Sequence, residues 1–249
     1  MRVFVLSDLH ANLPATEAVL ADAARVGWEL ALVLGDLVGY GADPAPVIDL
    51  VRGLPNATVI RGNHDKVASR IEDPADFNAV ARQAAEWTAD QLDPDRAAYL
   101  RMLPRGPLDI DGLGTDVAIC HGAPFDEDHY LFDVDDVAAA FGATGAALVF
   151  CGHTHLQMAF RYTESGRHPV VTRLDDQRIS MGDGLRTLVN PGSVGQPRDG
   201  DARAAYAMLD TGDGSVTLHR VDYDIAEAQR RILEAGLHPS LAERLSVGR

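Results

Sequence analysis

The chain has 249 residues, of which 46% are hydrophobic and 24% are charged, so it has the composition of a globular protein and the length for one large core. Its formal net charge of −15 argues against an extended nucleic-acid surface, because a protein that grips duplex phosphates usually carries a basic face. A phosphate-bearing substrate would therefore need local positive charge, which bound metal ions could supply.

Five short apolar runs predict buried strands, because each is bounded by turn residues and is too short for a helix. In chain order they are Val3–Leu6, Leu30–Leu34, Ala57–Ile60, Val117–Cys120 and Ala147–Cys151. Helical patterns separate several of them, at Leu13–Val26, Pro44–Arg52 and Asp135–Phe141. Strands that alternate with helices predict an α/β fold with a largely parallel sheet covered by its crossovers.

Two helical stretches, Phe77–Leu92 and Asp95–Leu103, interrupt this alternation and predict a helical hairpin inserted at about residues 74–103. The hairpin either overhangs a site or packs against the edge of the sheet. After Gly166 the pattern changes to alternating strands with Gly-Asp turns at Gly182–Gly184 and Gly212–Gly214, which predicts a second, mainly antiparallel sheet packed on the first. The expected strands are Pro169–Arg173, Leu185–Val189, Ala204–Leu209 and Ser215–Val221, and the expected closing helices are Asp224–Ala235 and Ser240–Leu245. No linker interrupts the chain, so we expect one domain over residues 1–249.

Potential metal ligands follow every one of the five apolar runs. The runs end in Ser7-Asp8-Leu9-His10, Gly35-Asp36, Gly62-Asn63-His64-Asp65, His121-Gly122 and Gly152-His153-Thr154-His155. In open α/β sheets, sites form just beyond the carboxyl ends of the strands, so we expect these side chains to converge. The neighbouring glycines allow tight turns and a close approach of the backbone to whatever is bound.

The spacing of the donors indicates which of them act together. Asp8 and His10 are two residues apart, so on a continuing extended backbone both would face the same side, and His153 and His155 repeat this arrangement. The donors are nitrogen and oxygen only, which suits Mn²⁺, Fe, Zn²⁺, Co²⁺ or Ni²⁺ and is too rich in imidazole for a dedicated Mg²⁺ or Ca²⁺ site. A lone histidine at a strand end is usually a surface residue, whereas five such strand ends in one chain predict a metal site.

The order of these motifs resembles the full signature of the calcineurin-like metallophosphoesterases, from Asp8 to His155. The resemblance implies a four-layer α/β/β/α sandwich, in which two mixed sheets are flanked by helices. The phrases Gly-Asp-Leu-Val-Gly-Tyr-Gly, from Gly35, and Asn-Pro-Gly-Ser-Val-Gly-Gln-Pro-Arg, from Asn190, resemble the small prokaryotic phosphodiesterase-like branch of that superfamily.

The resemblance also implies the role of each motif residue. One metal ion would be bound by Asp8, His10 and His155, the other by Asn63, His121 and His153, and both by the bridging carboxylate of Asp36. We expect two divalent transition metal ions, with Mn²⁺ preferred, and a phosphate ester cut by a hydroxide that bridges them. His64 is implied to contact the phosphate and to protonate the leaving oxygen, so Asp36 and His64 are the expected catalytic residues.

The sequence leaves the roles of several further residues undecided. Asn12 either contacts the phosphate or orders its loop, and Asp65 is expected to bind loop amides instead of orienting His64. The turn that contains Asn190, Ser193 and Arg198 offers amides and a guanidinium for a phosphoryl oxygen, although ordinary turn chemistry is the favoured explanation. Tyr40 offers a ring for a base or sugar.

The sequence therefore predicts a metal-dependent hydrolase of a phosphodiester or phosphomonoester in a small molecule, preferably a nucleotide. A diadenosine polyphosphate hydrolase is an alternative within this class, and the acid excess disfavours a nuclease. A non-catalytic interaction scaffold is the alternative of another class, because one retromer subunit resembles this fold and works as a scaffold. A scaffold need not keep every ligand, and this chain keeps all of them.

The remaining features bear on location. Cys120 and Cys151 are too few for a disulfide framework and are expected to be buried thiols. The first apolar stretch is too short for a signal peptide, and no run is long enough to cross a bilayer. We expect a cytoplasmic protein without a membrane partner. The sequence does not decide whether it forms a homo-oligomer.

Overall fold

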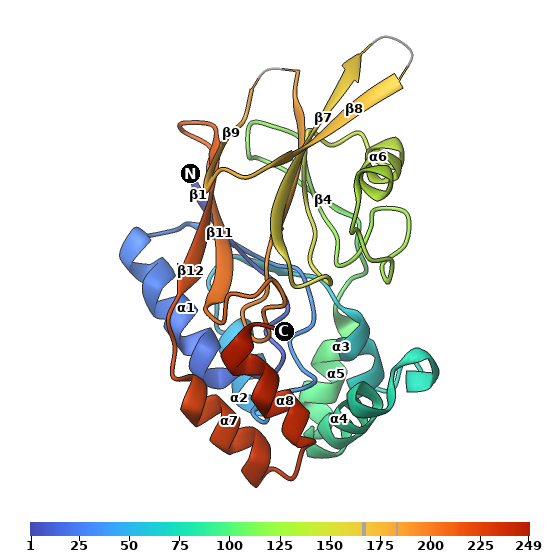
Figure 1. Ribbon diagram of the computed structural model, residues 1–249, viewed down its shortest axis with the longest axis vertical. Coiled ribbons are helices and arrows are strands. Elements are labelled where there is room, and N and C mark those ends of the chain that lie inside the picture. The colour runs from blue at the N-terminus through green and yellow to red at the C-terminus, as the bar shows by residue number, and fades with distance from the viewer. Residues whose placement is uncertain (166–167, 183) are drawn as a thin grey trace.

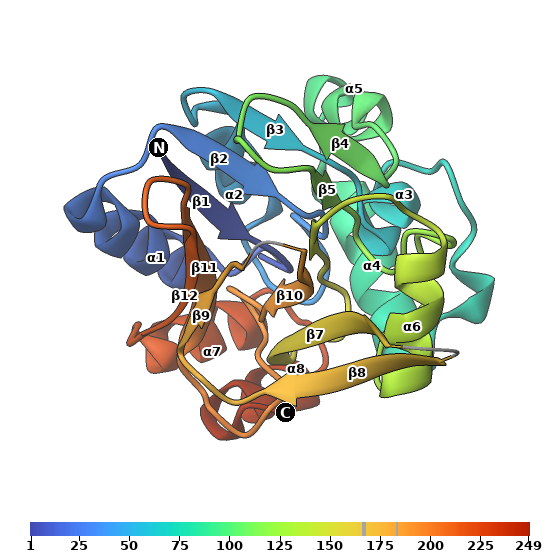
Figure 2. The ribbon, with the colours of Figure 1, turned by 90° about the horizontal axis from the view of Figure 1, so that it is seen from above.

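The chain folds into two β-sheets that lie face to face between outer helices (Figure 1). The structure, a computed structural model, describes residues 1–165, 168–182 and 184–249. Within these residues the strands form two sheets of six strands each. Seen from above, α1 and α6 lie on opposite outer sides of the sheets (Figure 2). The predicted four-layer α/β/β/α sandwich with two mixed sheets is confirmed.

The first sheet has the order β3-β2-β1-β11-β12-β9. Strands β1, β2 and β3 pair in parallel, whereas β11 pairs antiparallel with β1 and continues the sheet into β12 and β9. The bounds are β1 Arg2–Leu6, β2 Leu30–Val33, β3 Ala57–Val59, β9 Arg178–Ser180, β11 Ala204–Asp210 and β12 Ser215–Val221.

The second sheet has the order β4-β5-β6-β10-β7-β8. Strands β5, β6 and β10 run parallel, and β4 and β7 add antiparallel neighbours on either side. The bounds are β4 Leu108–Ile110, β5 Val117–Ile119, β6 Leu148–Phe150, β7 Gln157–Ser165, β8 His168–Leu174 and β10 Arg186–Pro191.

The predicted division into an early parallel sheet and a later antiparallel sheet is wrong. The five strands that precede the potential ligands are split, with β1, β2 and β3 in the first sheet and β5 and β6 in the second. The later strands complete both sheets, since β11 pairs with β1 and β10 pairs with β6. Local apolar patterns reveal a strand but not its partner, which non-local packing selects.

Alternating side chains of the strands build the layers of the core. Phe4 and Leu6 of β1 point toward the helices, whereas Val3 and Val5 point toward the other sheet, as expected for a strand with both faces buried. The outer face of the second sheet packs against Val137 of α6. Cys120 and Cys151 are buried in this layer as free thiols, as predicted.

The helices cover the outer faces of the sheets and the end of the molecule where the strands lead into the loops. The α-helices are α1 Leu13–Val26, α2 Pro44–Arg52, α3 Asn63–Ala68, α4 Ala79–Gln91, α5 Pro94–Met102, α6 Val134–Gly142, α7 Ile225–Glu234 and α8 Pro239–Glu243. Two 3₁₀-helices are η1 Pro74–Asp76 and η2 Arg244–Val247. None of the described helices has the length and apolar character needed to cross a bilayer.

The structure leaves two predictions about the organisation of the chain untested. That α4 and α5 form an insertion in a single domain of residues 1–249 stays a prediction. The boundary at Gly166 and the middle of the Gly182–Gly184 turn lie outside the described residues.

Candidate active site

Loops that follow strands of both sheets meet at one end of the sandwich. The loop after β1 bonds to the loop after β2, with the amide of Asp8 donating to the carbonyl of Gly35 (3.1 Å) and that of His10 to the carbonyl of Asp36 (3.0 Å). The second sheet joins through the amide of His153, which donates to the Asp8 carboxylate at 3.1 Å. The sequence prediction that distant strand ends converge is therefore confirmed.

The backbone at these strand ends differs from the expected one. Asp8 and His10 have φ angles of 55° and 46°, so the chain leaves β1 in a left-handed conformation and does not continue extended. Asp36, His153 and His155 also have positive φ, between 52° and 66°. Such conformations are unfavourable for residues with a Cβ atom and persist where the surrounding structure holds them, often at functional sites. The side chains therefore converge through strained turns, not through strand periodicity.

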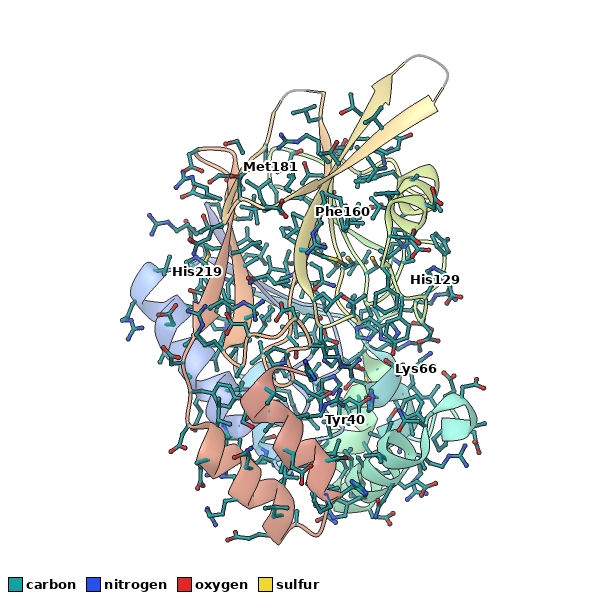
Figure 3. The ribbon with its side chains drawn as sticks, in the orientation of Figure 1. Tyr40, Lys66, His129, Phe160, Met181 and His219 are labelled. Atoms are coloured by element: carbon teal, nitrogen blue, oxygen red, sulfur yellow. The ribbon has the colours of Figure 1, made fainter. Side chains whose placement is uncertain are left out.

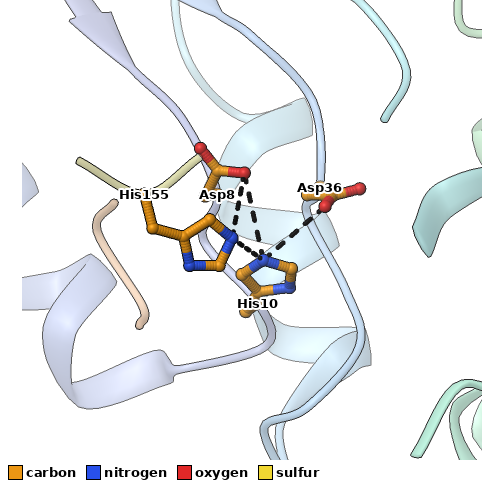
Figure 4. A group of neighbouring side chains, drawn as sticks. All are labelled: Asp8, His10, Asp36 and His155. Carbon is orange, nitrogen blue, oxygen red and sulfur yellow. Dashed lines mark hydrogen bonds and ion pairs between the residues drawn. The ribbon is translucent and has the colours of Figure 1, made fainter. Parts of the chain in front are cut away.

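A first group of buried donors consists of Asp8, His10, Asp36 and His155 (Figure 4). The Nε2 atoms of His10 and His155 are 3.0 Å apart. Oδ1 of Asp8 lies 3.4 Å from Nε2 of His155, and Oδ2 of Asp36 lies 3.6 Å from Nε2 of His10. One ligand atom from each of the four residues lies within 4.8 Å of all the others.

A second group shares Asp36 with the first and adds His121 and His153. Nε2 of His121 lies 3.4 Å from Oδ2 of Asp36 and 3.0 Å from Nδ1 of His153. Oδ1 of Asn63 is 3.2 Å from the same His121 nitrogen. The seven residues that the motifs predicted are thus brought together in two adjacent groups around one carboxylate oxygen.

The hydrogen bonds on the far side of each ring determine which nitrogen carries the proton. Nδ1 of His10, His121 and His155 faces the backbone oxygen of Val38, Leu34 and Gln196 at 3.0, 2.8 and 2.6 Å, and Nε2 of His153 faces that of Asp128 at 3.0 Å. A carbonyl oxygen only accepts, so each of these nitrogens donates, and in the neutral ring the inner nitrogen keeps its lone pair.

When the rings are neutral, two pairs of inner nitrogens point lone pairs at each other over 3.0 Å, His10 with His155 and His121 with His153. In the second pair a proton on His121, whose pKa is raised, can lie between the two nitrogens. The oxygen of Asn63 adds a third acceptor to the second pair. Acceptors at such distances repel unless a proton or cation lies among them, and backbone partners that orient imidazole in this way are typical of metal sites. The donors present fit two divalent transition metal ions.

Burial and charge set the ionisation of the site. Burial lowers the pKa of His10, His153 and His155 well below the usual histidine value, so these rings are neutral near pH 7. For His121, burial is outweighed by the Asp36 carboxylate, which raises the pKa of the ring to about 10. A metal ion would take the place of that proton, because both need the same lone pair.

Glycines at two of the strand ends allow the close packing of these groups. A Cβ atom on Gly152 would collide with the hydroxyl of Ser7 and approach Oδ2 of Asp8 to 2.9 Å. One on Gly62 would collide with the Asp36 carboxylate. At both positions the backbone therefore packs directly against the carboxylates of the donor groups, whereas its predicted approach to a bound group stays a prediction.

His64 lies beside the two donor groups and belongs to neither. Its ring packs between Tyr40 and Phe77, with centroid distances of 4.3 and 4.7 Å, and burial lowers its pKa to about 4. Its Nδ1 is buried without a hydrogen-bond partner among the described residues. Asp65 does not orient it, because the Asp65 carboxylate accepts from the amides of Leu37 and Gly62, both at 2.9 Å. The predicted loop role of Asp65 is confirmed.

Arg198 is the one predicted substrate contact with free bonding capacity. Its Nη2 donates to Gln196 at 3.1 Å and reaches the Tyr40 hydroxyl at 3.5 Å, and its Nε is buried without a partner among the described residues. The backbone amide of Arg198 donates to the carbonyl of His155 at 3.2 Å, so the residue lies next to the first donor group. The Tyr40 ring itself is already covered by His64 on one side and His10 on another.

The other predicted substrate contacts hold loops in place. Asn12 caps α1 by accepting from Ala15 and donates to the carbonyl of Gly195 at 2.8 Å. Asn190 is fully buried, donates to the carbonyl of Gly152 at 2.8 Å and accepts from Gly192. The side-chain amides of both residues are engaged in these contacts, which favours the loop-ordering role for Asn12 and ordinary turn chemistry for Asn190. Ser193 likewise donates to the carbonyl of Asp8 at 2.7 Å.

Three residues at the site were not predicted to act there. The ring of Tyr130 stacks on His153 with a centroid distance of 3.7 Å, and Phe77 covers His64. Lys66 is buried and pairs with Asp128 at 2.6 Å, the residue whose backbone oxygen holds the His153 ring. Tyr130 and Phe77 belong to no sequence motif that would have indicated a role at the site. Lys66 directly follows Gly-Asn-His-Asp, and this position was the one indication in the sequence that it lies near the site.

Comparison with known proteins places this site in a family. A model of the calcineurin-like phosphoesterase superfamily domain matches residues 1–214. An uncharacterized protein of Methanocaldococcus jannaschii is 36% identical over 251 residues, which cover 99% of this chain and 98% of that protein. The phosphodiesterase YfcE of Escherichia coli is 29% identical over 213 residues, 84% of this chain and 88% of that protein.

A solved structure supports the same assignment. The crystal structure of a metallophosphoesterase from Sphaerobacter thermophilus has a TM-score of 0.83 and 38% sequence identity, and the match covers 100% of this chain and 99% of that one. The predicted small prokaryotic branch agrees with these relatives. The chain belongs to the calcineurin-like phosphoesterase superfamily.

Proposed function

We propose that this protein hydrolyses a phosphodiester or phosphomonoester bond in a small molecule, preferably a nucleotide, with the help of two divalent metal ions. The observation that carries the proposal is the pair of inner imidazole nitrogens, 3.0 Å apart, in each of two groups that share Asp36. Each pair needs a proton or a cation between its two nitrogens, and one metal ion in each group would meet that need in both. The relative named as a phosphodiesterase supports the same chemistry.

The ligand sets follow from the two groups. One ion would be held by Asp8, His10 and His155, the other by Asn63, His121 and His153, with Asp36 between them. Mn²⁺ is our first choice, because the nitrogen and oxygen donors suit it and its neighbours in the series, while Fe, Zn²⁺, Co²⁺ and Ni²⁺ fit the same donors. Backbone carbonyls already hold all four rings in the ligating tautomer.

The chain's own residues would divide the work of hydrolysis. Bound ions would lower the pKa of a water molecule and offset the negative charge of the phosphoryl oxygens. Asp36 would link the two groups, because its Oδ2 faces both of them. Its Oδ1 accepts from the amide of His64 at 2.8 Å, which holds the carboxylate in place. Arg198 would bind a phosphoryl oxygen. The negative charge of a bound phosphate would raise the pKa of His64 from about 4, and the protonated ring would then give its proton to the leaving oxygen as the ester bond breaks.

The preference for a nucleotide rests on the surface beside the second group. Tyr130 is 40% exposed, stacks on His153 and lies parallel to Phe132, which is 58% exposed. Exposed flat rings next to a phosphate site can stack on a base. The net charge of −15 disfavours a long nucleic acid and favours a small substrate.

The proposal is tested by metal analysis and a substrate screen on the full chain. Protein purified without chelator should contain about two metal ions per chain by the two-site reading. After addition of Mn²⁺ it should hydrolyse bis-p-nitrophenyl phosphate, p-nitrophenyl phosphate, or mononucleotides and cyclic nucleotides. A folded protein that binds no metal and hydrolyses none of these would contradict the proposal and favour the scaffold alternative.

A further inference from the structure

His64, the proposed proton donor, is held differently from the four imidazole rings of the donor groups. Each of those rings is oriented by a hydrogen bond to a backbone oxygen. Neither nitrogen of the His64 ring forms a hydrogen bond among the described residues, although its Nδ1 is buried. A ring without such a bond is oriented by the groups packed around it, so the contacts of His64 decide where its nitrogens point.

The His64 ring is enclosed on several sides. A Cβ atom on Gly39 would collide with Nδ1 of His64, so the backbone there lies directly against this nitrogen. The rings of Tyr40 and Phe77 pack against the imidazole with centroid distances of 4.3 and 4.7 Å. Tyr40 lies where the sheets meet the lower helices (Figure 3). Because Nδ1 is buried against Gly39, Nε2 is the nitrogen left to reach a substrate.

Phe77 reaches His64 from a segment that is otherwise exposed. Within residues 75–79, Phe77 is half-buried and every other residue is exposed. Its ring belongs to none of the clusters of core residues in the described part of the chain. The burial of Phe77 therefore serves the contact with His64 and not the general core.

Local hydrogen bonds fix the backbone on both sides of Phe77. Its amide donates to the carbonyl of Pro74 at 3.0 Å and closes η1. Asn78 caps α4 by accepting from two amides of its first turn. The guanidinium of Arg82 donates to the carbonyls of Pro74 and Ala75 at 3.2 and 2.8 Å. A fixed backbone thus presents the Phe77 ring, as is needed for a side chain that positions another one.

We propose that Phe77 is a positioning residue for the reaction, which holds the His64 ring so that Nε2 faces the leaving oxygen of the ester. As the bond between phosphorus and that oxygen breaks, the oxygen keeps the electron pair of the bond and takes the proton of Nε2. A ring that is free to turn would present this proton less often, and a misplacement of about 1 Å can cost about 10²-fold in rate. The role of Phe77 rests on the proposed function, in which His64 donates the proton.

The test uses pairs of esters that have similar shapes and different leaving groups, in excess Mn²⁺. Bis-p-nitrophenyl phosphate is compared with diphenyl phosphate, and p-nitrophenyl phosphate with phenyl phosphate. A nitro group stabilises the negative charge of the departing oxygen, so the nitrophenyl esters depend little on a proton donor and the phenyl esters depend on one strongly. The measured quantity is the kcat of the phenyl ester divided by the kcat of its nitrophenyl partner.

In Phe77→Ala this ratio should fall about tenfold with unchanged metal content, because the proton donor is present and poorly placed. Phe77→Leu should keep part of the ratio, since it keeps apolar bulk without the flat ring. His64→Ala should lower the ratio further. Adding Phe77→Ala to His64→Ala should change nothing more, as expected of a residue that acts only through His64.

Trp87→Ala is the matched control for a loss of packing in the same part of the chain. Trp87 lies in α4 and packs against the cluster of buried residues that includes Ile232 and Leu241. Its loss should lower the Tm and leave the ratio of kcat values unchanged, because this side chain is not one of the groups packed around His64.

The possible outcomes separate the role of Phe77 from the proposed function. An unchanged ratio in folded, metal-replete Phe77→Ala protein overturns the role of Phe77, as does an equal fall in Trp87→Ala or a further fall when Phe77→Ala is added to His64→Ala. An unchanged ratio in His64→Ala, or wild-type hydrolysis of the nitrophenyl esters alone, overturns the proton-donor role of His64 and the role of Phe77 with it. Wild-type protein that is loaded with metal and hydrolyses no ester of the screen overturns the whole proposed function.

Discussion

Replacing Asp36 with asparagine should remove both metal ions at once, because its Oδ2 atom is the only carboxylate oxygen that faces both groups of donors within the described residues. The change is conservative in shape. An asparagine oxygen can still accept the amide of His64, the bond that Oδ1 makes at 2.8 Å. The amide group that replaces Oδ2 would turn hydrogens toward nitrogens that need a cation, and it would not carry a charge.

The effect on stability can be estimated from linkage. An ion present at 100 times its dissociation constant adds about 2.7 kcal/mol to the free energy of unfolding, so two independent ions add about 5 kcal/mol. For a chain of this length, about 1 kcal/mol shifts the Tm by roughly 2–4 °C. We therefore expect Mn²⁺ to raise the Tm of the wild-type protein by roughly 10–20 °C over that in chelator. Asp36→Asn should lose most of that rise.

The assay combines metal content, thermal unfolding with Mn²⁺ or chelator, and hydrolysis of bis-p-nitrophenyl phosphate. Asp22→Asn is the matched control, because Asp22 bonds to the Tyr206 hydroxyl at 2.7 Å and belongs to neither donor group. The control should keep both ions and the full Mn²⁺-dependent rise in Tm. If Asp36→Asn retained two ions per chain and the wild-type rise in Tm, the bridging role of Asp36 would be refuted.

Two further substitutions test residues that lie beside the two donor groups. His64→Ala should lower kcat by about 10²-fold or more with unchanged metal content, the scale of a positioned proton donor, and equal turnover of metal-replete variant and wild type would exclude that role. Lys66→Met should weaken Mn²⁺ binding by about tenfold, because Lys66 holds Asp128, whose backbone oxygen orients the His153 ring. Titration with Mn²⁺ measures the affinity. Lys66→Arg, which keeps the positive charge, should restore most of it. Unchanged affinity in Lys66→Met would show that the ion pair does not position the His153 ring.

Local patterns predicted most of the secondary structure. The helices α1, at Leu13–Val26, and α2, at Pro44–Arg52, begin and end where their apolar spacing, prolines and following glycines indicated. Strand β7, at Gln157–Ser165, was not predicted, because its charged and polar residues hide the alternation. The short helix α3 was not predicted either, because its six residues are too few to show a helical apolar spacing.

The pairing of strands could not be predicted in the same way. The apolar run at Val117–Ile119 looks like that at Val3–Leu6, yet the two strands lie in different sheets. Each run is buried on both faces, so the pattern contains no information about which neighbour it meets. The choice depends on how whole sheets and helices pack together.

The identity of the site's donors was determined by the sequence alone, because the motif residues from Asp8 to His155 and their glycines have a chemistry that few other functions need. The tertiary structure decided their geometry. Left-handed turns aim the side chains, and carbonyls from distant loops select the tautomer of each ring. It also decided what surrounds the donors, including Tyr130, Phe77 and Lys66. These contacts join residues far apart in the chain, and their energies arise only when the chain is folded.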